Sequence, residues 1–199
     1  MTPLYRMGDT QPPGNNIAFL QVGVPSYRIS QMVANGGTIV DAYGYVNVIS
    51  PSGLPIRAIV GIRPDPIMLV AINCVNVEES KSFYQDQLGF TEQTYPYARP
   101  SNGTGPFEPL QPKGSVYMAP SPNCMGVLLL PLTKKKQTIV PNPVLDSLQI
   151  VYAPSSSSGA ASSSSDANDK IMPSVIDPSN VKINFVKVSD FEQEERQTR

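Results

Sequence analysis

The clearest pattern of apolar and polar positions lies at residues 67–90. It opens with an apolar run at 67–75, which is long enough for one buried strand. Asn76 can cap the first turn of a following helix, and Glu79 can reach back to the cap amide. Gly89 stands where a left-handed C-terminal cap is expected. The apolar positions that recur at helical spacing in between are Phe83, Tyr84 and Leu88. The stretch therefore predicts a buried strand, a helix and the start of another strand.

The same succession of patterns occurs earlier in the chain, at 16–62. A strand is expected at 16–23, and then a helix at 26–35, whose apolar positions have the i, i+3, i+4 spacing. The glycine pair at 36–37 ends that helix. The strands expected after it lie at 38–41, 43–50 and 54–62. After the second helix, strands are expected at 91–97, 114–118 and 125–130. Both regions therefore predict the order β-α-β-β-β.

The C-terminal region repeats this order only in part. A strand is expected at 148–152, but 155–165 then holds eight serines in eleven positions. Such a run carries no apolar stripe, so we expect a flexible loop where the other regions have a helix. Strand patterns resume at 175–178 and 181–188. The chain therefore reads as a divergent internal repeat whose third copy is incomplete.

The last of these strands predicts a contact between distant regions. Val181, Ile183 and Phe185 point to one side of a regular strand, and we expect that side to pack on residues 66–132. Without a helix, this region keeps an uncovered face or an unpaired edge. We expect that remainder, together with the Pro/Gly-rich loop at 98–113, to meet a protein partner.

Three stretches resemble the modules of the vicinal oxygen chelate superfamily, the glyoxalase-like proteins. They are FYQDQLGF at 83–90, NIAFLQV at 16–22 and SPSGLPIRAIVG at 50–61. The resemblance implies an α+β fold of repeated βαβββ modules forming curved mixed sheets, of the tandem type seen in plants and algae. The segments expected are an extended lead-in at 1–15, a closing-type module at 16–62, an opening-type module at 66–132, a degenerate module at 147–190 with its serine-rich insertion at 153–170, and a tail at 191–199.

The composition excludes several classes of function. The 199 residues carry a net charge of −1, whereas nucleic-acid binding needs a concentrated basic face. No apolar stretch reaches the roughly 18 residues that a membrane span requires. Histidine is absent, so neither a Ser-His-Asp nor a Cys-His arrangement can form. Cys74 and Cys124 fall at opposite ends of neighbouring strands, and we expect them to remain unbonded.

The resemblance also locates the metal-ligand positions of the superfamily's enzymes. These enzymes hold a divalent metal through His or Gln on the first strand of a module and Glu on its last. The resemblance carries these positions onto Asn16 and Arg57, onto Leu69 and Leu129 or Leu130, and onto Leu148 and Asn184. Leucine offers no donor atom, and arginine repels a cation. We therefore expect no metal, no other cofactor and no catalytic residue.

The remaining candidate residues are scattered along the chain. Asp41, Glu92 and Glu108 are expected to be surface carboxylates, although Asp41 or Glu92 would be the candidate base of an enzyme. Cys124 is expected to be an inert thiol, buried or half-buried, because no histidine can activate it. Alternating aromatic residues could line a ligand cup or an interface, or simply pack in the core. They are Tyr43, Tyr45, Tyr95, Tyr97 and Phe185.

Two kinds of function remain open. The first is a non-catalytic glyoxalase-like protein that acts as a binding or scaffold subunit of a larger protein assembly, which the lost ligand positions favour. The resemblance to plant and algal proteins suggests a plastid, photosynthetic complex, with the chain peripheral to its membrane. The cytoplasm is the alternative location. The second kind is a metal-independent glyoxalase- or dioxygenase-like enzyme, or a protein that binds a small molecule in the same cup.

Overall fold

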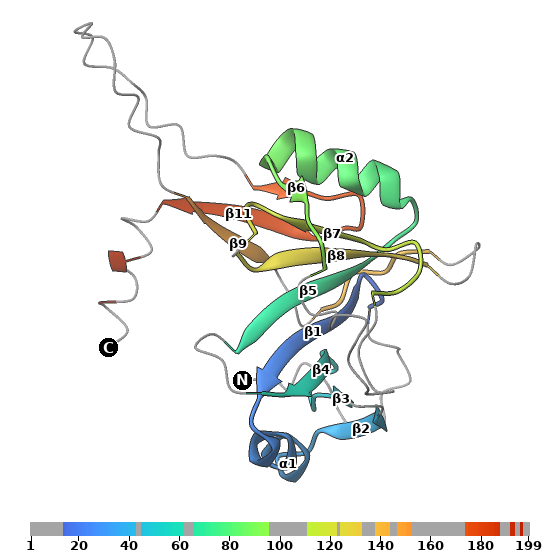
Figure 1. Cartoon of the computed structure of the whole chain (residues 1–199), viewed down its shortest axis with the longest axis vertical. Helices are drawn as coiled ribbons and strands as arrows, with labels where there is room; N and C mark the ends of the chain where they lie inside the picture. Colours follow the sequence, from blue (N-terminus) through green and yellow to red (C-terminus); the bar gives the residue numbers. More distant parts are fainter. Residues whose placement is uncertain are drawn as a thin grey trace, which may run out of the picture.

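The described residues form one eight-stranded mixed sheet and one three-stranded sheet, with two helices on the same side of the large sheet (Figure 1). The α+β fold of curved mixed sheets expected from the sequence is confirmed. The structure is a computed structural model, and it describes residues 14–42, 45–61, 66–95, 111–122, 124–132, 138–143, 147–152, 174–187, 192–193 and 196.

The elements fall into three groups, which we call the first, second and third modules. The first contains β1 (Ile17–Val24), α1 (Ser26–Ala34), β2 (Thr38–Ala42), β3 (Val46–Ile49) and β4 (Pro55–Val60). The second contains β5 (Ile67–Cys74), α2 (Val77–Leu88), β6 (Thr91–Glu92), β7 (Val116–Ala119) and β8 (Gly126–Pro131). The third contains β9 (Leu148–Tyr152), β10 (Val175–Ile176) and β11 (Lys182–Lys187). Both expected helices are confirmed, and the strand expected at 91–97 is much shorter than its pattern suggested.

The strand pairing follows one rule in all three modules. The first strand of each module pairs in parallel with its last strand, as β1 with β4, β5 with β8 and β9 with β11. The large sheet has the order β2-β3-β4-β1-β5-β8-β7-β6, so its two modules meet where β1 and β5 pair antiparallel. The small sheet has the order β10-β11-β9, which leaves β9 at an edge.

The two helices differ in how firmly they are held. The Asn76 side chain accepts hydrogen bonds from the amides of Glu78 and Glu79, and Gly89 has the left-handed φ of 66° expected of a C-cap. The expected return bond from the Glu79 carboxylate is not formed. Helix α2 buries Tyr84, whereas no residue of α1 is buried. Figure 1 shows α2 lying over the second module beside the small sheet.

The small sheet packs on the helix side of the large one. Val181 and Ile183 are 3% and 0% exposed and belong to the same apolar cluster as Tyr84 and Leu129. Phe185 is half-buried and packs against that cluster. The expected packing of this face on the second module is therefore confirmed. The serine-rich insertion and most of the loop at 98–113 lie outside the described residues.

A buried polar group fixes the third module to α2 and β5. The Tyr84 hydroxyl donates to Asp177 Oδ2 at 3.0 Å, while Asp177 Oδ1 accepts from the amides of Ser179 and Val181, both at 2.8 Å. The Ser179 hydroxyl lies 3.5 Å from Cys74 Sγ. Burial raises the pKa of Asp177, and the three hydrogen bonds to its carboxylate oppose that shift only in part. The carboxyl therefore holds its proton more tightly in the folded chain than in the unfolded one.

The buried face of β11 predicts a graded loss of stability. We expect Ile183→Ala to lower the free energy of unfolding by about 2–5 kcal/mol, because it leaves a cavity in the cluster beneath α2. Phe185→Ala should cost less than the 3–5 kcal/mol typical of a fully buried Phe, because Phe185 is only half-buried. Ile176→Ala is the control, since Ile176 is 64% exposed. Urea unfolding measures all three, and equal losses for Ile183 and Ile176 would contradict the packing.

The raised pKa of Asp177 predicts an unusual pH dependence. Its contribution to stability is greatest below the unfolded-state pKa of about 3.9 and is lost as the pH rises through the higher folded-state value. The wild type should therefore gain stability relative to Asp177→Asn when the pH is lowered from 7 toward 4. Ile183→Ala introduces no change in titrating groups, so its difference from wild type should not vary with pH. A wild-type advantage that grows with rising pH would show that the pKa is depressed instead.

Candidate functional site

The sheet face opposite the helices, which we call the cup face, is the face on which the resemblance predicts the metal-ligand positions. Here it carries a compact apolar cluster, and every member is at most 9% exposed. Its members are Phe19, Leu69, Ala71, Tyr95, Tyr117, Ala119, Leu128 and Leu130. The centre of the cup face therefore consists of buried apolar side chains.

Arg57 lies beside this cluster, between two aromatic rings. Its guanidinium carbon is 3.8 Å from the centre of the Phe19 ring and 4.4 Å from that of Tyr45, which indicates cation–π contacts. Arg57 Nε donates to Asn47 Oδ1 at 3.1 Å, and Asn47 Nδ2 donates to Asp41 Oδ1 at 2.7 Å. Burial lowers the pKa of Arg57, while Tyr45 and Asp41 act to raise it. An arginine starts from so high a pKa that it stays cationic at neutral pH.

Tyr95 spans the cup from one module to the other. Its ring meets Tyr117 of β7 edge-on, with the ring centres 6.1 Å apart, and its hydroxyl donates to Gln21 Oε1 of β1 at 3.2 Å. Gln21 is fully buried and is in register with Arg57 on one neighbouring strand and with Leu69 on the other. Because Tyr95 turns across the sheet, it does not continue the strand that its alternating pattern predicted.

Asn16 is not at the cup position that the resemblance suggested. Its Oδ1 accepts from the amides of Ile17 at 2.9 Å and Asn142 at 2.7 Å, and its Nδ2 donates to the Asn180 carbonyl at 3.3 Å. These bonds tie the start of β1 to two distant segments, away from the contacts of Arg57. Asn16 is therefore a structural residue.

Phe19 occupies the position that was assigned to Asn16. Strands β1 and β5 each have eight residues, and Leu20 pairs with Val70, the fourth residue of each strand. Phe19 is thus the counterpart of Leu69. The resemblance therefore placed this position three residues too early in the chain.

The other carried-over positions divide between two faces. Leu129 belongs to the core on the helix side, so the last-strand position of the second module on the cup face is Leu128, with Leu130 also on that face. Leu148 packs against the helix-side cluster, and Asn184 Nδ2 donates to Ser147 Oγ at 2.9 Å. These two described residues of the third module therefore do not reach the cup.

The residues at the cup do not fit a divalent metal. The positions of the four ligands are occupied by Phe19, Arg57, Leu69 and Leu128, none of which is a metal ligand. In the part of the chain that the structure describes, no three His, Cys, Asp or Glu residues are grouped closely enough to hold a metal ion. The only side-chain nitrogen atoms among the four belong to Arg57, a half-buried cation.

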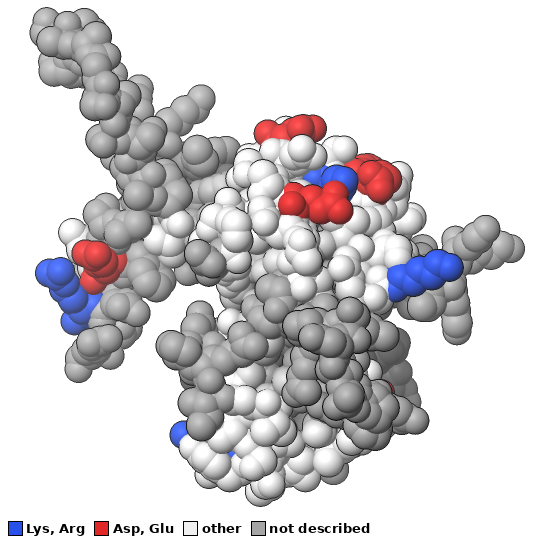
Figure 2. Space-filling view, viewed as in Figure 1, with Lys and Arg blue, Asp and Glu red and all other residues white. Residues whose placement is uncertain are grey.

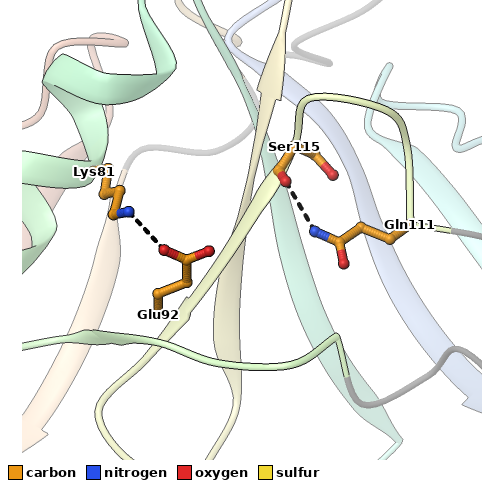
Figure 3. A network of polar contacts seen from close by, with 4 residues as sticks. All are labelled: Lys81, Glu92, Gln111 and Ser115. Carbon is orange, nitrogen blue, oxygen red and sulfur yellow. Dashed lines mark hydrogen bonds and ion pairs between the residues drawn. The ribbon is translucent and has the colours of Figure 1, made fainter.

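The other candidates for chemistry do not converge. Glu92 forms an ion pair with Lys81 of α2 at 2.6 Å. Figure 3 shows that this pair is not connected to the nearby hydrogen bond that the Gln111 side chain donates to the Ser115 carbonyl oxygen. Asp41 is exposed and accepts a hydrogen bond from the Asn47 side chain. Cys124 is exposed, which corrects the expectation of a buried or half-buried thiol, although both cysteines are unbonded as expected. Tyr43, Tyr97 and Glu108 lie outside the described residues.

A cleft of about 730 Å³ lies on the opposite side of the sheet, beside α1. Apolar residues of β1, β3, β4 and the helix line it, including Val24, Met32, Val48 and Ile56. Arg28 is the charged residue of its lining. The cleft exists because α1 covers this side of the sheet only loosely.

Two βαβββ modules joined through their first strands, with the helices on one face, define the glyoxalase-like fold of the vicinal oxygen chelate superfamily. Glyoxalase I from Zea mays is similar to this chain with a TM-score of 0.54 and 14% sequence identity, over 97% of this chain and 75% of the maize chain. One mutant of the maize enzyme gives a TM-score of 0.55 at 15% identity, over 96% of this chain and 75% of the mutant chain. A second mutant gives a TM-score of 0.52 at 15% identity, over 91% of this chain and 70% of the mutant chain. At this identity the likeness shows the fold. No protein-family model matches the chain, and no curated protein sequence matches it.

The contact across the cup predicts a measurable coupling. Tyr95→Phe removes the hydroxyl that donates to buried Gln21, and we expect it to cost about 1–3 kcal/mol of stability. Gln21→Leu removes the acceptor and should cost a similar amount. The double variant should lose clearly less than the sum, with a coupling of about 1 kcal/mol in urea unfolding. Strictly additive losses would contradict a bond between the two side chains.

Proposed function

We propose that this chain is a non-catalytic glyoxalase-fold protein that acts as a binding or scaffold subunit of a larger protein assembly. One observation carries the proposal: the cup where relatives of this fold do chemistry is filled by Phe19, Leu69, Leu128 and the spanning Tyr95, with Arg57 stacked at its side. An enzyme of this fold needs open coordination or a substrate space at that place. The proposed setting in a plastid complex rests on the resemblance of the sequence to plant and algal proteins. Among the described helices, none is long and apolar enough to cross a membrane.

The alternative enzyme would need a base in the cup, and its two candidates are placed unfavourably. Asp41 lies on the edge strand β2 and accepts a hydrogen bond from Asn47. Glu92 lies on β6, the opposite edge strand of the large sheet, and forms an ion pair with Lys81. Neither carboxylate belongs to the buried cluster of the cup face. The arrangement therefore gives more support to a binding role than to catalysis.

Small-molecule binding is a second candidate, favoured by the cleft beside α1. Its volume of about 730 Å³ and its apolar lining are typical of a ligand site. A bound ligand should raise the melting temperature, and Met32→Trp, which places a bulky side chain in the cleft lining, should reduce that rise. Val33→Trp is the matched control, because Val33 lies on the same helix outside the lining. A rise unchanged in Met32→Trp would place the ligand elsewhere.

The proposed function predicts a defined result for the native protein. The chain is tagged in its own cells and purified without chelators, and then its metal content and its partners are measured by elemental and native mass spectrometry. We expect less than stoichiometric Zn, Ni or Fe and a protein partner at a fixed ratio. Cys124→Ser is the control that removes adventitious metal at the exposed thiol. One tightly bound metal per chain that survives this substitution, without a partner, would favour the enzyme.

A further inference from the structure

Among the described strands, β9 lies at an edge of the small sheet. It pairs in parallel with β11 on one side, and the order β10-β11-β9 leaves its other side without a strand among the described residues (Figure 1). Leu148 and Ile150 face the core and are half-buried, whereas Gln149 is exposed and Val151 is 42% exposed. The strand Leu148–Tyr152 carries no charged residue and no proline. Its free backbone groups can therefore pair with another strand.

The other described sheet edges carry features that discourage pairing. Strand β2 has a register shift between Ile39 and Asp41, and Asp41 places a charge on it. Strands β6 and β10 are each two residues long. Bulges, charges and short length are the usual means by which proteins protect a sheet edge. Strand β9 is thus the unprotected edge of the described structure.

The large sheet contains a pairing between two strands that are equivalent to β9. β9 occupies the same place in its module as β1 and β5, because each pairs in parallel with the last strand of its module. In the large sheet, the free edges of β1 and β5 pair antiparallel about a local two-fold axis near Leu20 and Val70. A first strand of a module therefore accepts another first strand, running in the opposite direction.

We propose that β9 pairs antiparallel with β9 of a second copy of this chain, across a two-fold axis, to form a continuous six-stranded sheet. Identical strands satisfy such an axis, and the pairing closes because each copy contributes a single edge. The net charge of −1 opposes association only weakly. In the view of Figure 2, charged side chains gather over α2, and most of the other described surface is uncharged. The proposal does not depend on the function assigned to the cup.

The expected dimer is weak and reversible. A pair of five-residue strands buries much less than the roughly 1,600 Å² of a standard interface, so the dimer should depend on protein concentration. Sedimentation analysis of the full chain should show a monomer at low concentration and a dimer as the concentration rises, from about 1 to 300 μM.

Charged substitutions on β9 test whether the two copies of this strand pair. Gln149→Lys with Val151→Lys places four like charges around the axis, and this variant should remain monomeric, as should Gln149→Glu with Val151→Glu. An equimolar mixture of the two should form a heterodimer. Gln149→Thr with Val151→Thr is the matched control, because it keeps the strand uncharged and should still form the homodimer. Circular dichroism confirms that each variant folds.

Each possible outcome decides the proposal. A monomeric wild type at the highest concentration overturns it and leaves the edge for a different protein. A dimer that persists in the lysine variant, or a mixture that stays monomeric, also overturns it, because the contact would then lie elsewhere. Dimerisation of the wild type, loss in both charged variants and recovery in the mixture support it. A spin label at Gln149 should then report a short distance between copies, and a label at Thr38 of β2 a long one.

Discussion

The antiparallel pairing of β1 with β5 is the interaction on which the structure depends. It joins two modules of four strands into one sheet and sets which residues share each face. Leu20 and Val70 face the helix side, while Gln21 and Leu69 face the cup. The central strands are almost entirely buried, so a slip of one residue would exchange the two faces. The pairing is therefore strongly specified.

The strand pairing also determines which residues meet at the cup. The β1–β5 pairing brings Phe19 and Leu69 to this face, and the neighbouring strands β4 and β8 add Arg57 and Leu128. The polar groups that remain there are satisfied within the chain: Gln21 by Tyr95, and Arg57 by Asn47 and two aromatic rings. A half-buried cation held in this way stabilises the packing around it, and its charge opposes the binding of another cation.

The third module shows how an incomplete repeat can still be stable. It has no described helix, and its sheet is covered instead by packing on the cluster beneath α2, through Val181 and Ile183. The Tyr84–Asp177 hydrogen bond fixes that contact, with the carboxylate also holding the turn that leads into β11. Packing covers one face of this sheet, and among the described strands the outer edge of β9 has no partner.

The sequence by itself determined the elements and the fold class, because the apolar runs, the spacing of helical positions and caps such as Asn76 and Gly89 act within a few residues. It also predicted the buried face of β11, since alternation along a strand is a local property. Which residues lie at the cup was decided by the tertiary structure. Phe19, the counterpart of Leu69 in the pairing of β1 with β5, takes the place expected for Asn16, and the Tyr95 hydroxyl bonds Gln21, which is 74 positions away in the sequence. Such contacts depend on how distant strands align, and no local pattern encodes that alignment.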